Sequence, residues 1–111
     1  MNPFRSLKTE TIHTLEGTEV NAYVEQKTGR KIDPVRNGDV CGDDSEGHLV
    51  VHVARRRDGL YSLSPGHEKM LKTFIETGVG QPTTIIDILL CELATRGDIP
   101  EGTYHIHYTW G

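Results

Sequence analysis

The sequence is short of cysteine and of long hydrophobic runs, and each shortage excludes a class of protein. Only two cysteines, Cys41 and Cys91, occur in 111 residues. That is too few for a disulfide scaffold, so reduced thiols in a cytoplasmic protein are expected. The longest apolar run, Ile85 to Leu90 interrupted by Asp87, is too short to cross a bilayer. The first residues lack the apolar region of a secretory signal, so no membrane association is expected.

Positive charge is also in short supply. Twelve Lys and Arg against 16 Asp and Glu give a formal net charge of −4 at pH 7. Nucleic acid is therefore not the expected partner, because proteins that bind it generally carry a surplus of cations to neutralise phosphates. The length and the 35% hydrophobic content fit one globular domain over residues 1–111.

Alternating polarity predicts β structure in the first part of the chain. In residues 19–26, Val20, Ala22 and Val24 would share one face of a strand and Tyr23 would lie on the other. The strands expected in this way cover residues 9–15, 19–26, 31–32, 48–55 and 60–63, with a hairpin turn at Asp58-Gly59 between the last two.

Two consecutive helices and a final strand are expected in the second part. The first helix starts at Pro65 and has an apolar stripe formed by Met70, Leu71, Phe74 and Ile75. The second ends at Gly97, and residues 103–110 form the C-terminal strand. This order predicts an α+β fold, with an antiparallel sheet of about five to six strands and two helices packed on one face. If the last strand lies at a sheet edge, it would pair across a homodimer.

The histidines give the strongest chemical signal. Because side chains alternate along a strand, His105 and His107 share one face of the last strand, and His48 and His52 share one face of an earlier one. If those two strands are neighbours, four imidazoles gather on one polar surface, where they could act as acid and base or ligate zinc. The simpler interpretation is that a solvated sheet face needs polar residues.

Two alternatives follow from these histidines. One is a metal-independent ribonuclease or phosphodiesterase, in which His105 or His107 is the base, His52 the acid and Arg56 the phosphate ligand. The other is a histidine-rich metal-binding protein. No complete catalytic motif supports an enzyme, because the single H-x-T at residues 107–109 has no partner motif and no phosphate loop is present. No cofactor and no resident metal are therefore expected.

The loop over residues 35–47 is the second candidate site. It is expected to be flexible, and its acids are Asp39, Asp43, Asp44 and Glu46. A calcium loop is excluded, because Cys41 and His48 stand at the positions where the fifth and twelfth ligands should be. The sequence therefore favours a non-enzymatic binding or regulatory module, an inhibitor or adaptor of a bacterial or mobile-element system. It would dock on a basic protein through this acidic loop.

Overall fold

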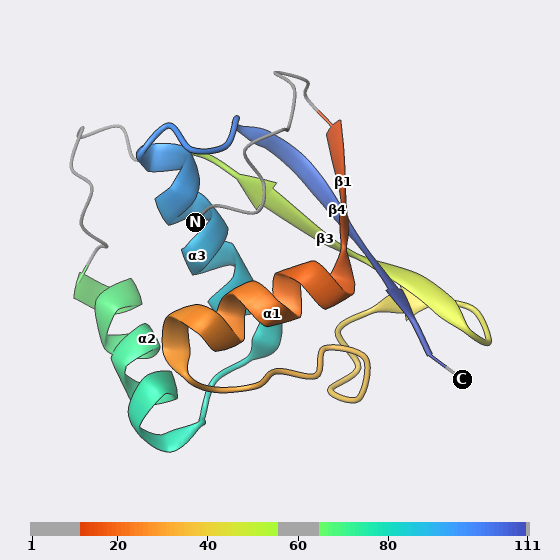
Figure 1. The fold of residues 1–111 in the computed structure, drawn as a ribbon, viewed down its shortest axis with the longest axis horizontal. Coiled ribbons are helices and arrows are strands. Elements are labelled where there is room, and N and C mark those ends of the chain that lie inside the picture. Colours follow the sequence, from red (N-terminus) through yellow and green to blue (C-terminus); the bar gives the residue numbers. More distant parts are fainter. Residues whose placement is uncertain (1–11, 56–64, 111) are drawn as a thin grey trace.

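The computed structural model describes residues 12–55 and 65–110. The elements, in chain order, are β1 (Ile12–Glu16), α1 (Gly17–Thr28), β2 (Cys41–Gly42), β3 (Glu46–Val53), α2 (Pro65–Thr77), α3 (Pro82–Thr95) and β4 (Gly102–Thr109). The strands form one sheet in the order β1-β4-β3-β2. In Figure 1 the helices lie to one side of this sheet, so the expected α+β class is confirmed, but the described residues form three helices where two were expected.

The expected strand over residues 19–26 is wrong, because this segment is part of helix α1. Val20 and Val24 would be buried in a strand as well as in a helix, so Ala22 and Tyr23 decide which of the two forms. Tyr23 is 4% exposed, whereas Ala22 is exposed. Residues i, i+3 and i+4 share one helix face, so the helix buries the large ring that a strand would leave in water. Gly29, with φ at 73°, ends the helix by donating its N–H to the carbonyl oxygen of Glu25.

The sheet also differs from the expected one in its strands. Residues 12–55 and 65–110 form four strands, where five to six were expected for the whole chain, and β1 runs parallel to β4. Residues 31–32 form no strand, and the loop over residues 35–47 contains β2 and a turn held by Asn37 N–H to Asp33 O. The expected strand over residues 60–63 lies outside the described residues. β4 lies between β1 and β3, so the condition for its pairing across a dimer, a position at the sheet edge, is not met.

The core lies between the sheet and helix α3. Side chains of β3 and β4 that face the helices are buried, as are Ile85, Ile86, Leu89, Leu90 and Leu93 of α3. Helix α2 packs on α3 instead of on the sheet, so only Phe74 of its expected stripe is buried, while Met70 and Ile75 are 50% and 42% exposed. None of the described helices is long and apolar enough to cross a membrane.

Strand β1 continues into helix α1 without a loop. The junction is Gly17, which lies so close to the ring of Tyr108 that a side chain at this position would overlap it. The Tyr108 hydroxyl donates a hydrogen bond of 2.8 Å to Asn21 Oδ1 on the first turns of α1. This contact holds the end of β1 against the end of β4, and thereby places Glu16 beside His107.

Candidate functional site

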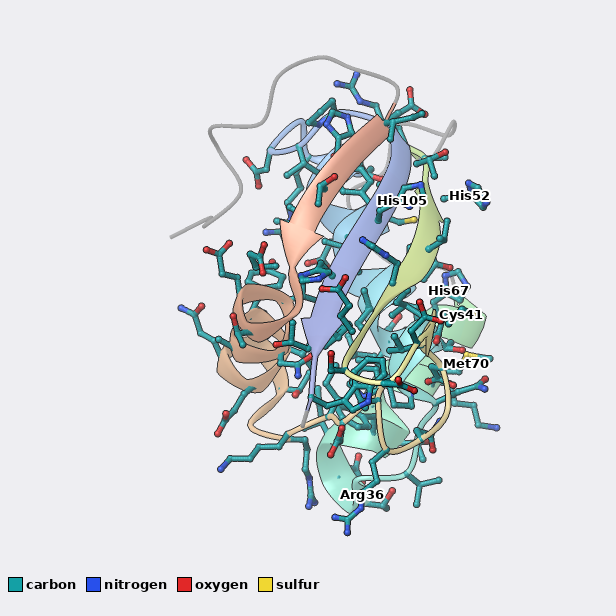
Figure 2. The ribbon with its side chains drawn as sticks, turned by 90° about the vertical axis from the view of Figure 1, so that its right-hand side faces the viewer. Arg36, Cys41, His52, His67, Met70 and His105 are labelled. Atoms are coloured by element: carbon teal, nitrogen blue, oxygen red, sulfur yellow. The ribbon has the colours of Figure 1, made fainter. Side chains whose placement is uncertain are left out.

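The face of the sheet opposite the helices carries the four histidines expected to gather there. We call this surface the open face; the side chains on it are Ile12, Thr14 and Glu16 of β1, Cys41 of β2, Glu46, His48, Val50 and His52 of β3, and Thr103, His105, His107 and Thr109 of β4. Figure 2 views the molecule from this side, and His52 and His105 project from it. Strands β3 and β4 are antiparallel neighbours, so the adjacency that the sequence left open is present.

The hydrogen bonding of β3 and β4 brings two of these histidines close together. Trp110 donates its N–H to Ser45 O, so Ser45 and Trp110 form a hydrogen-bonded pair. In an antiparallel ladder every second pair is of this kind, so Leu49 and Ile106 are also hydrogen-bonded to each other. His48 and His107 therefore face each other at a non-hydrogen-bonded pair, where opposing side chains are closest. Their ring centroids are 5.2 Å apart.

His107 also lies between two carboxylates. Its Nε2 is 3.3 Å from Glu46 Oε2, and its Nδ1 is 3.7 Å from Glu16 Oε2. The two carboxylate side chains are 66% and 63% exposed, so each contact contributes little energy. Their main effect is to place negative charge on both sides of the ring. The sequence does not single out Glu16, because only the long-range pairing of β1 with β4 brings it to this site.

His52, the expected catalytic acid, contacts neither His105 nor His107 in any interaction that the structure shows. Its Nδ1 is 3.3 Å from Thr103 Oγ1, the residue opposite it on β4. His48 takes the central place instead, since its ring is 6.1 Å from that of His105 as well as 5.2 Å from that of His107. Arg56, the expected phosphate ligand, lies outside the described residues.

A row of four polar residues crosses the whole sheet at this level. In register across β2, β3, β4 and β1 are Cys41, His48, His107 and Glu16. In the described part of the chain, however, no group of three or more His, Cys, Asp or Glu side chains could hold a metal ion. The row is therefore a polar stripe of pairwise contacts and has no geometry suited to a metal.

A cavity of about 330 Å³ opens beside the end of this row. Its lining includes His107, Trp110, Arg36 and two carboxylates, Glu16 and Asp33. The single Arg provides a cation for an anionic ligand, but the two carboxylates repel such a ligand. The cavity does not favour phosphate over a neutral or cationic group.

The tyrosines of β4, Tyr104 and Tyr108, have side chains buried on the helix side of the sheet. Burial raises the pKa of Tyr104 to about 12, and burial raises the pKa of Tyr108 above its usual range. Their hydroxyls donate hydrogen bonds to Pro100 O at 2.6 Å and to Asn21 Oδ1.

The expected acidic surface is concentrated at the turn between β2 and β3. Asp43 donates its N–H to Glu46 O at 2.9 Å, which closes a tight turn, and the side chains of Asp43, Asp44 and Glu46 are exposed. We call these three residues the acidic hairpin. Figure 1 shows this hairpin extending beyond the helical layer. Asp39 is different, because it is half-buried and accepts 3.2 Å hydrogen bonds from Asn37 Nδ2.

Asp43 and Asp44 form no ion pair with a Lys or Arg of the described residues, whereas Glu46 contacts His107. Within the described residues, Asp43 and Asp44 therefore present unneutralised charge at the margin of the open face. Comparisons with protein-family models, curated proteins and solved structures gave no match.

Proposed function

We propose that this protein is a non-enzymatic binding module that docks on a basic surface of a partner protein through the acidic hairpin. The observation that carries this proposal is the exposure of Asp43 and Asp44 on a projecting turn without a Lys or Arg partner in the described residues. Unpaired carboxylates at a projecting turn attract a basic partner and orient it before contact.

The open face supports the same function. The helices of the structure leave it uncovered, and it continues directly from the acidic hairpin through Glu46 and His48. A partner seated on the hairpin would therefore also contact polar side chains of the sheet, whose hydrogen-bonding groups provide specificity. Inhibitors and adaptors act through surfaces of this kind, and the chain's net charge of −4 suits a basic target.

The proposal is tested with a phage-displayed library of short random peptides selected on the folded protein. We expect the recovered peptides to be rich in Lys and Arg, and to bind about tenfold more weakly to an Asp43→Asn/Asp44→Asn variant, since each exposed charge contact is worth up to about 1 kcal/mol. Raising the salt concentration from about 0.05 to about 0.3 M should weaken binding as well.

The matched control is Glu25→Gln/Glu68→Gln, which removes the same charge from exposed positions on α1 and α2. This variant should bind as the unmodified protein does. Equal binding by the hairpin variant and the unmodified protein, or recovery of acidic peptides, would show that the hairpin is not the docking site.

A second candidate function rests on the contact between His48 and His107. Two imidazoles at a ring separation of 5.2 Å could act as the acid and base of a metal-independent phosphodiesterase. The substrate would be a fluorophore-labelled RNA oligonucleotide. His48→Gln and His107→Gln should each lower cleavage by about a hundredfold or more, while His52→Gln, on the same face but outside the pair, should cleave normally. Absence of cleavage by the unmodified protein would remove this candidate.

A further inference from the structure

The outer edge of β3 is only partly covered by its neighbour. Strand β2 pairs with β3 at two positions, Gly47 and His48, but β3 continues to Val53. In the described residues no strand pairs with β3 beyond His48 on this side. An uncovered strand edge presents backbone hydrogen-bonding groups that a second chain can use.

The backbone hydrogen bonds near the start of β3 determine which residues present these groups. Asp43 N–H donates to Glu46 O across the turn, so β3 residues at even positions direct their N–H and C=O groups toward β2. The bond from Trp110 N–H to Ser45 O agrees, because it places odd positions toward β4. Val50 and His52 therefore direct two N–H and two C=O groups into the space beyond β2.

This stretch of edge is closed at both ends. At one end Cys41 occupies the position opposite His48. At the other, the backbone of Ala54 lies near the Cys91 sulfur of α3. Burial raises the pKa of Cys91 to about 11, and the neighbouring Ala54 backbone opposes the increase in part. The open stretch therefore spans only Leu49 to Val53.

We propose that Val50 and His52 bind a short extended segment of a basic partner protein, which adds to the sheet as a strand beside β3. This inference rests on the proposed binding function and names the form in which the partner is bound. Four backbone hydrogen bonds would supply affinity, and alternate side chains of the segment would supply specificity. Val50, which is 43% exposed, provides an apolar contact on the open face.

The closed ends argue against a second copy of this chain as the occupant. An antiparallel β3 of another copy would have to continue along the same line and would meet Cys41 at one end and Cys91 at the other. A segment that is extended over about three residues and then turns away fits between them. Partner termini and loops can adopt that shape.

The charges around the edge argue for a basic segment. The acidic hairpin lies along the strand toward β2. On the helix side, the Cys91 thiol donates to Asp87 Oδ1 at 3.3 Å, so a half-buried carboxylate stands next to the Ala54 end. The middle residue of a bound segment, opposite Val51, would point to this side of the sheet. We expect Lys or Arg there.

Amide hydrogen exchange measured by NMR tests the edge directly. In the free protein, the amides of Val50 and His52 should exchange at least about a hundredfold faster than those of Leu49, Val51 and Val53, which bond to β4. Adding a basic peptide recovered from the library should slow the exchange of Val50 and His52. Equal exchange at odd and even positions in the free protein would refute the pairing on which the proposal depends.

Variants separate this inference from the proposed function. Val50→Pro removes one outward N–H and leaves the ladder to β4 intact, as proline does on edge strands. Val50→Lys keeps the backbone and adds repulsion, in case the proline variant does not fold, and Val50→Thr is the matched control. We expect the recovered peptide to bind about tenfold or more weakly to the Pro and Lys variants, and normally to the Thr variant.

The outcomes differ for the two proposals. If Asp43→Asn/Asp44→Asn weakens binding while both the Pro and Lys variants bind normally, the strand-addition site is wrong and docking on the hairpin stands. If the Pro and Lys variants lose binding while the hairpin variant retains it, the partner is not held by the hairpin's charge. Docking on the hairpin is then wrong. A peptide methylated at its backbone nitrogens should not bind, and tight binding of that peptide would also refute strand addition.

Discussion

Replacing Gly17 with alanine is expected to destabilise the protein strongly, although alanine is normally the better helix residue. A Cβ at Gly17 would overlap Cδ1 and Cε1 of Tyr108 and lie 2.8 Å from the carbonyl oxygen of His107. The backbone oxygen belongs to the central strand, so it cannot move without shifting the sheet. The ring is 5% exposed and is held by its hydrogen bond to Asn21.

The magnitude follows from these contacts. Inserting a carbon into such a space costs about 1–3 kcal/mol, and displacing the ring adds about 1 kcal/mol for the lost hydrogen bond. Because alanine has the higher helix propensity, the substitution also adds up to about 1 kcal/mol to the free energy of unfolding, and less at the first helical residue. We therefore expect Gly17→Ala to lower the free energy of unfolding by about 2–3 kcal/mol, a large part of a typical domain's stability.

The assay is equilibrium unfolding in urea, followed by the fluorescence of Trp110, the only tryptophan. Gly66→Ala on α2 is the matched control, because a Cβ there would meet no atom within 4 Å. That variant should be as stable as the unmodified protein or more stable by up to about 1 kcal/mol. If Gly17→Ala changed the free energy of unfolding by less than about 0.5 kcal/mol, the contact between α1 and β4 would be wrong.

Three further expectations concern the thiols, the response to alkali and a buried histidine. Cys41 is exposed, whereas the raised pKa of Cys91 keeps its thiol protonated. Ellman's reagent should therefore react quickly with Cys41 and with Cys91 only on unfolding. Cys41→Ser should remove the fast phase. Burial raises the pKa of Cys91 from 9.0 to about 11, so between these pH values the folded protein keeps a proton that the unfolded chain loses. The free energy of unfolding should therefore be constant below about pH 9 and fall from there toward pH 11, and Tyr104 should add to the loss above pH 10. Urea midpoints that stay constant over this range would contradict the prediction. His13 is 5% exposed and its ring stacks on that of Tyr104 with 4.7 Å between centroids, but its Nε2 has no hydrogen-bond partner in the described structure. His13→Phe should therefore raise the free energy of unfolding by about 1 kcal/mol. A decrease of that size would count against the stacked geometry.

The sequence is informative where the apolar pattern fits one type of element only. Strand β3 can be identified because its apolar residues alternate with polar ones, and helix α3 because its apolar run is longer than a buried strand. Helix α1 is mistaken for a strand because Val20 and Val24 satisfy both periods. Whether this segment forms a helix or a strand depends on whether the ring of Tyr23 can be buried, and that depends on the packing of α1 against β4 and α3.

The candidate site can be anticipated in part. Alternation places His48, His52, His105 and His107 on two strand faces, which the structure confirms. It cannot show that β3 and β4 are neighbours or which histidines oppose each other, because register is set by contacts across more than 50 residues of sequence. For the same reason the sequence does not predict the pairing of His48 with His107 or the position of Glu16 beside it.

The central position of β4 determines the order in which this protein can fold. β4 joins β1 to β3, so neither of those strands has its main partner until the ribosome has synthesised residues 102–109. Until then helix α1 lacks the strand on which it packs. The pairing of Ile12 with Thr103 then closes a loop of most of the chain, which is a slow step. During synthesis, helix α1 and the edge of β3 that pairs with β4 are therefore open to chaperones and to aggregation until the last strand is made.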